Sequence, residues 1–131
     1  YWFTAQDDFL ILRLRVPPDA FGTEVQNIQV MRFNTATPSA NHTTLFYQNN
    51  IPAAAWANTV LVIKKNDVIG ILGARGTTTM RNMYAPGGNI TIKGKTVPIA
   101  RLYYQMNLNT TPAGSVVGTS GNIASVEFEY Y

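Results

Sequence analysis

The segment Phe9-Leu10-Ile11-Leu12-Arg13-Leu14-Arg15-Val16 decides the fold class of this chain. Every second position from 10 onward is apolar: Leu10, Leu12, Leu14 and Val16. The positions between them hold Ile11, Arg13 and Arg15. Because successive side chains of a strand point to opposite faces, this alternation predicts a half-buried β-strand over 9–16. The prolines at 17 and 18 predict its end, since proline cannot donate to a ladder.

Strand-forming segments recur along the rest of the chain. They cover 26–33, 43–48, 59–64, 68–73, 89–93, 97–106 and 122–130. Gly, Pro and Asn residues typical of turns separate them, and no segment keeps a helical period over three turns. This pattern predicts one all-β domain over 1–131, an antiparallel two-sheet β-sandwich of the jelly-roll-like type.

Two turns and one strand pairing are specific enough to predict. Lys65-Asn66-Asp67 predicts a hairpin between 61–63 and 68–71, and Gly94 predicts one between 91–93 and 96–97. In the last segment Glu127 and Glu129 alternate with an apolar face: Ala124, Val126, Phe128 and Tyr130. If the first and last long strands pair antiparallel, these glutamates face the two arginines across the ladder. The alternative is that both pairs of charges only face solvent.

Composition limits the function classes. The chain has 131 residues, 46% hydrophobic and only 13% charged, with a net charge of +3 and no cysteine. The ten basic residues are dispersed, whereas a nucleic-acid footprint needs clustered charge. A weakly charged polar surface suits close contact with other surfaces. No run approaches the ~18 apolar residues of a membrane helix. Because the chain begins with Tyr1 and not with Met, we expect a processed product, an excised domain or a sequence assigned without its precursor, and removal of a signal peptide stays open.

No catalytic constellation emerges from the residue types. His42 is the only histidine, which excludes the usual zinc sets and leaves no partner for a nucleophile, so we expect it in an exposed loop. No carboxylate stands in an apolar context that would raise its pKa. Asp7, Asp8 and Asp19 leave calcium as an alternative, although charges at strand starts that discourage edge pairing explain them better. We therefore predict no enzyme and no cofactor. Gly70, Gly73 and Gly76 lie within and just after a strand, where they predict a bulge or tight bend.

Aromatic residues are the best candidates for ligand or interface contacts, because they combine apolar area with a polar handle. The candidate contacts are Tyr1, Trp2, Phe3, Trp56, Arg101, Tyr103, Tyr104 and Tyr131. Ordinary core packing is the competing interpretation for each. In Tyr103-Tyr104 and Tyr130-Tyr131, one member of each pair should face outward, since neighbours in a strand alternate.

Several segments carry a resemblance to a known family. They are Tyr1-Trp2-Phe3-Thr4-Ala5, Leu14-Arg15-Val16-Pro17, 70–79, 101–111 and 122–127. Together they resemble an uncharacterised all-β domain of secreted multidomain bacterial surface proteins of the Bacteroidota type. The resemblance implies export, an all-β fold and no catalytic residue. It also implies that Tyr1 continues from upstream sequence.

Two functions remain open at this point. The first is a non-enzymatic extracellular structural or adhesive module at the cell surface, self-assembling into a homo-oligomer, filament or surface layer by strand exchange through residues 1–5. The alternative is a carbohydrate-binding module that grips a glycan with Trp56, Arg101, Tyr103 or Tyr104. Nucleic-acid binding and membrane insertion are not expected. Whether the Asn-x-Thr sites at Asn41, Asn89 and Asn109 carry glycans depends on the source.

Overall fold

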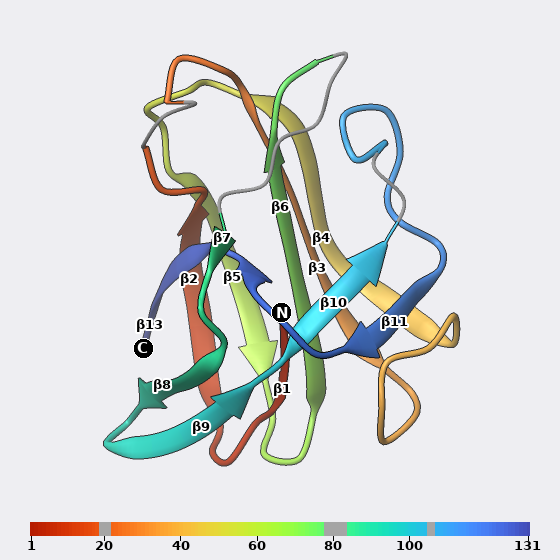
Figure 1. The fold of residues 1–131 in the computed structure, drawn as a ribbon. Coiled ribbons are helices and arrows are strands. Elements are labelled where there is room, and N and C mark those ends of the chain that lie inside the picture. The colour runs from red at the N-terminus through yellow and green to blue at the C-terminus, as the bar shows by residue number, and fades with distance from the viewer. Residues whose placement is uncertain (19–21, 78–83, 105–106) are drawn as a thin grey trace.

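The computed structural model describes residues 1–18, 22–77, 84–104 and 107–131. Of these residues 58% lie in strands and none in a helix, which confirms the all-β class. All strand pairs are antiparallel. The described residues accordingly include no helix that is long and apolar enough to cross a membrane. The axes of the longest strands are aligned along the length of the molecule, and the chain through β9 and β10 crosses them obliquely (Figure 1).

A four-stranded sheet has the order β1-β6-β3-β4. Its strands are β1 (Trp2–Thr4), β6 (Val68–Arg75), β3 (Gln26–Phe33) and β4 (His42–Ile51). The central β3–β6 ladder runs without a register shift from Gln26 opposite Arg75 to Phe33 opposite Val68. β3 and β6 are therefore the most regular part of the molecule.

A three-stranded sheet has the order β13-β2-β5. Its strands are β13 (Glu127–Tyr130), β2 (Phe9–Arg15) and β5 (Ala57–Ile63). Arg15 lies opposite Glu127, and Arg13 lies opposite Glu129. The predicted pairing of the first and last long strands is thus confirmed.

Short two-stranded ladders complete the fold. They pair β8 (Gly88–Ile92) with β9 (Lys95–Ile99), β10 (Arg101–Tyr104) with β11 (Val116–Thr119), and β7 (Tyr84–Ala85) with β12 (Ile123–Ala124). The β8–β9 turn confirms the predicted hairpin, because Lys93 and Gly94 adopt φ angles of 51° and 76°, as a type I′ turn requires. The predicted strand over 97–106 is interrupted at Ala100, which pairs with Trp2 instead, and Met106 lies outside the described residues.

Apolar side chains form two cores, one on each face of the four-stranded sheet. The larger core combines residues of both main sheets, including Phe3, Ile11 and Ile71. The smaller core lies on the opposite face, where Leu102 and Tyr104 of β10 and Val116 of β11 cover β3 and β6. Every residue of β6 is therefore buried. The half-buried pattern predicted for 9–16 does not extend to β6, because a second layer covers its outer face.

The glycines of β6 permit this two-sided packing. A Cβ atom added at Gly73 would lie 2.4 Å from Cγ2 of Val126, and one at Gly70 would lie 2.9 Å from Cε2 of Phe33. The predicted bulge at these glycines is wrong, since the β3–β6 ladder shows no register shift. The bend is found just beyond the strand, at Gly76, whose φ is 123°. Close approach of neighbouring side chains, not curvature, explains glycine within the strand.

Two further expectations need correction. The turn over residues 64–67 forms, with the Asp67 amide donating to Lys64 O, but it connects two different sheets instead of a hairpin. In β2 the buried positions are Phe9, Ile11 and Leu14, not one continuous alternation with Leu10. A register shift between Ile11 and Arg13 changes which alternate positions face inward.

Candidate functional site

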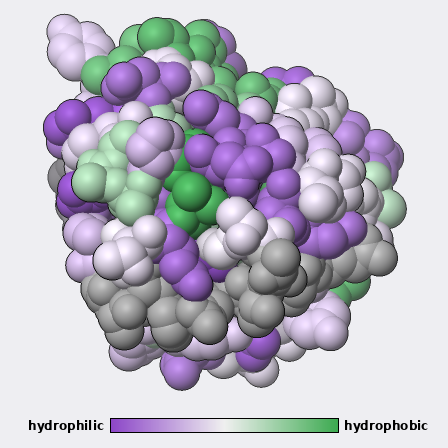
Figure 2. Space-filling model, turned by 90° about the horizontal axis from the view of Figure 1, so that it is seen from above, coloured by the Kyte–Doolittle hydropathy of each residue, from purple (hydrophilic) through white to green (hydrophobic). Residues whose placement is uncertain are grey.

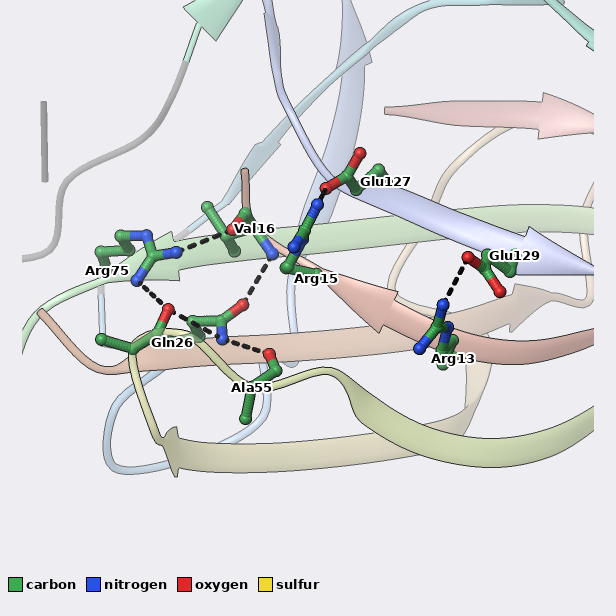
Figure 3. A network of polar contacts seen from close by, with 9 residues as sticks. Arg13, Arg15, Val16, Gln26, Ala55, Arg75, Glu127 and Glu129 are labelled. Atoms are coloured by element: carbon green, nitrogen blue, oxygen red, sulfur yellow. Dashed lines mark hydrogen bonds and ion pairs between the residues drawn. The ribbon is translucent and has the colours of Figure 1, made fainter. Parts of the chain in front are cut away.

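The outer face of the three-stranded sheet gathers charge at one end. Arg13 Nη2 donates to Glu129 Oε1 at 2.6 Å, and Arg15 Nε donates to Glu127 Oε1 at 2.6 Å (Figure 3). The pKa of Glu129 is lowered by the hydrogen bond from Arg13 and by the positive charges of both arginines. The glutamate therefore stays ionised to lower pH than a free carboxyl group does.

Trp56 belongs to this charged end. The Arg13 and Arg15 Cζ atoms lie 4.2 and 4.3 Å from the centre of its ring. Two guanidinium groups over one indole make favourable cation–π contacts. They also occupy ring surface that a sugar would need for stacking.

The other end of the same face is apolar. Tyr131 exchanges two backbone hydrogen bonds of 2.9 Å with Leu10, and Leu10 lies opposite Val62 of β5. These three residues form a row across the sheet, which we call the apolar row. Val60 adds to it two positions before Val62 along β5. The exposed fractions of Val60, Val62 and Tyr131 are 67%, 56% and 79%.

The first three candidate residues anchor β1 to its own domain. Tyr1 and Phe3 are buried in the larger core, whereas Trp2 is half-buried and packs against the smaller core. The Tyr1 amine donates to Ile71 O at 2.9 Å, and its hydroxyl donates to Val126 O at 2.8 Å. Burial lowers the pKa of this amine to about 5 and raises the pKa of the phenol.

The candidates on β10 lie on a different part of the molecule from Trp56. Tyr103 is exposed and faces Val117 of β11, whereas Tyr104 is buried in the smaller core, where burial raises its pKa. Arg101 is half-buried. Opposite orientations of Tyr103 and Tyr104 confirm the expected alternation. Tyr130 and Tyr131 alternate as well, since the Tyr130 ring packs edge-on against Phe9 and Phe128 on the core side, whereas Tyr131 is 79% exposed. Trp56 and the β10 residues therefore remain separate candidates for a glycan contact.

A hollow of about 670 Å³ lies beside Trp2. Its lining includes Trp2, Gln6, Lys65, Asn66, Lys95 and Pro98. Trp2 exchanges two backbone hydrogen bonds with Ala100. The next position of this antiparallel pair would place Thr4 opposite Pro98, and proline has no N–H to donate to β1. The two strands therefore separate, and the hollow opens between them.

The remaining titratable candidates stand apart from one another. His42 is a half-buried residue at the start of β4, not an exposed loop residue, because its ring packs edge-on against Phe33 with ring centres 5.7 Å apart. Lys95 lowers the pKa of Asp7 across a 3.5 Å ion pair. Asp19 lies outside the described residues. Among the residues that the structure does describe, no three His, Cys, Asp or Glu side chains group as metal ligands.

Sequence reasoning missed a buried polar network at one end of the cores. Arg75 donates to the carbonyl oxygens of Val16, Glu24 and Ala53, at 2.8, 2.6 and 3.1 Å. Gln26 accepts from the Val16 amide at 2.7 Å and donates to Ala55 O at 2.7 Å (Figure 3). Both side chains are fully buried. The sequence did carry a sign of this network. Gln26, Asn27 and Gln29 place polar side chains on both faces of a long strand, which indicates that some of them are buried with hydrogen-bond partners.

The surface above this network is mostly hydrophilic or neutral. Seen from above, it shows a small hydrophobic spot near the centre and a hydrophobic area along one edge (Figure 2). The network ties β2, β3, β6 and the β4–β5 connection together at this end. We interpret the network as a structural element, because Arg75 and Gln26 donate their hydrogen bonds to backbone carbonyl oxygens of the same chain.

Comparisons of the chain with protein-family models, curated proteins and solved structures return no match.

Proposed function

We propose that the chain is a non-enzymatic structural or adhesive module of a secreted, multidomain surface protein, and that copies of it self-assemble. We further propose that its two main sheets form a jelly-roll-like sandwich. The family resemblance, the 13% share of charged residues and the exposed apolar residues of the three-stranded sheet support this role.

The observation that carries the proposal is the construction of β1. This strand lies at the edge of the four-stranded sheet and is only three residues long. In and around it, Tyr1, Phe3 and Ala5 are buried at 4%, 1% and 1% exposure, while Thr4 is exposed. Alternate side chains filling a neighbour's core, together with main-chain bonds to an edge, are the features of strand addition.

Exchange follows from this construction if β1 of one copy pairs with β6 of the next. The contacts that β1 makes within its own domain are then made between copies, so little stability is lost. Because the donor and the acceptor are different surfaces, the contact is heterologous and can extend into a filament. Residues 5–8 between β1 and β2 would have to serve as the hinge.

A disulfide that locks β1 in its own domain tests this mechanism. Thr4 lies opposite Val68, and the flanking Tyr1–Ile71 bonds make this a non-hydrogen-bonded pair, with Cα atoms about 4.5 Å apart. The natural chain has no cysteine, so the double variant T4C/V68C forms one defined bond. We expect concentrated wild-type protein to form polymers in electron micrographs and the oxidised variant to form none.

The reduced double variant is the matched control and should regain polymerisation. Wild-type protein that stays monomeric at high concentration would contradict self-assembly. Polymers of unchanged length from the oxidised variant would contradict exchange of β1.

A carbohydrate-binding module remains the second candidate, favoured by the hollow beside Trp2. Gln6, Lys65, Asn66 and Lys95 bring hydrogen-bond donors to an opening that an indole flanks. Retention of a glycan on an array by wild-type protein, and its loss in K65A, would favour this function. A positive array that K65A leaves unchanged would place the glycan elsewhere.

A further inference from the structure

One edge of the three-stranded sheet has no partner within the described residues. β5 pairs with β2 on one side, and no other described strand pairs with it. The edge carries Val60 and Val62, whose side chains are largely exposed. An unpaired edge with exposed apolar side chains is a template for another strand.

The backbone of Val62 points toward this open edge. Leu10 uses its N–H and C=O groups to bond Tyr131, on the side away from β5. Leu10 and Val62 therefore form a non-hydrogen-bonded pair, in which the Val62 groups point away from β2. Val60, two positions earlier, has its side chain on the same face as Val62, since exposure keeps alternating along β5 through the register shift against β2.

The sequence of β5 places no charge and no proline on the edge, and its one irregularity is the extra residue between Leu61 and Asn58 at the register shift against β2. Natural edge strands are usually blocked by lysine, proline or an inward charge. Ala57–Ile63 reads Ala-Asn-Thr-Val-Leu-Val-Ile, with no charge and no proline, and the first charged residue after it is Lys64. Such a strand can pair antiparallel with an identical strand without placing like charges opposite each other.

We infer that β5 is a two-fold interface, in which the β5 strands of two copies pair antiparallel and join their three-stranded sheets into one. With Leu61 on the axis, Val60 of each copy lies opposite Val62 of the other. Lys64 then lies opposite the uncharged Asn58 of the second copy. This register places the outward-pointing N–H and C=O groups of the two β5 strands opposite each other. It also extends the apolar row across the interface.

A second copy fits better than an unrelated chain for two reasons. The charge pattern of β5 is self-compatible in this register, and a two-fold contact satisfies both edges at once. The inference rests on the proposed role as a self-associating module, but it uses a surface separate from β1. The β1 contact extends a chain of copies, whereas the β5 contact joins two copies and closes.

Replacement of Val62 by proline tests the interface with little change to the monomer. Its N–H points away from β2 and has no strand partner among the described residues, and proline is tolerated at open edges. Symmetry removes two intermolecular hydrogen bonds at once, so we expect dimerisation of V62P to weaken at least about tenfold in sedimentation velocity. V62T is the matched control, because it keeps the N–H, and it should still dimerise.

Cysteine pairing tests the register even if V62P folds poorly. In an oxidised equimolar mixture of V60C and V62C, we expect the mixed disulfide dimer to exceed each homodimer by far more than the roughly twofold excess that random pairing gives. Dimerisation of folded V62P at wild-type strength, or a mixed dimer at only that statistical excess, would overturn the β5 interface while leaving β1 exchange intact. A wild-type protein that never associates would overturn the β5 interface together with the proposed function.

Discussion

At the scale of single residues, burial decides which side chains can take part in contacts with other molecules. Tyr1, Phe3 and Tyr104 are candidates by residue type, yet each is buried in one of the two cores. Trp56 is half-buried, but two arginines lie over its ring. Residue type thus identifies side chains capable of recognition, and packing removes most of them. Tyr131, 79% exposed, is the candidate that remains most available.

Glycine at position 73 illustrates how a missing side chain determines packing. We expect G73A to lower the free energy of unfolding by about 1–3 kcal/mol, because the new methyl group would overlap the Val126 side chain. Thermal or urea unfolding measures the change. G114A is the control, since a Cβ at Gly114 meets no atom within 4 Å and should alter stability little. Equal melting temperatures for the two variants would show that β12 and β13 move aside at no cost.

At the scale of elements, strand identity followed from local pattern, whereas strand partners did not. The alternation around β2 and β13 predicted both strands and the opposition of Arg13 and Arg15 to two glutamates. By contrast, the short turn after β5 predicted a hairpin, and the chain crosses to the other sheet instead. The reason is that β6 gains two flanking strands, β1 and β3, by leaving β5.

The ion pair between β2 and β13 makes stability depend on pH. Because the folded pKa of Glu129 is lowered, its contribution is present above the unfolded value and is lost as pH falls through the folded value. We expect E129Q to melt slightly below wild type at pH 7, with a gap that closes under acid conditions. Since both side chains are substantially exposed, the effect should be small and should shrink with salt.

The double variant R13Q/E129Q completes this experiment as a thermodynamic cycle. If the two single changes add without coupling at neutral pH, the contact of 2.6 Å contributes no net stability.

At the scale of the whole molecule, the four-stranded sheet is the shared wall between two cores. β6 is paired on both sides and covered on both faces, so its opening requires disruption of both cores. The β8–β9 hairpin, in contrast, has several exposed residues and a tight turn at its tip. Stability should therefore be distributed unevenly over the fold.

Hydrogen exchange measures this distribution. We expect the amides of 69–72 to exchange slowest, at a rate set by global unfolding, and those of the β8–β9 hairpin to exchange faster through local opening. Amides of β6 that exchange as fast as those of the hairpin would show that the smaller core detaches independently.

The sequence by itself determined the all-β class, most strand positions, the turn at Gly94 and the charge pairing of the first and last long strands. These features depend on side-chain alternation and turn chemistry within a few residues, which a linear pattern records. Only the tertiary structure decided which sheet each strand joins, the burial of β6 on both faces, the Arg75 network and the open edge of β5. These depend on contacts between residues far apart along the chain, whose partners are set by packing of the whole molecule and not by local preference.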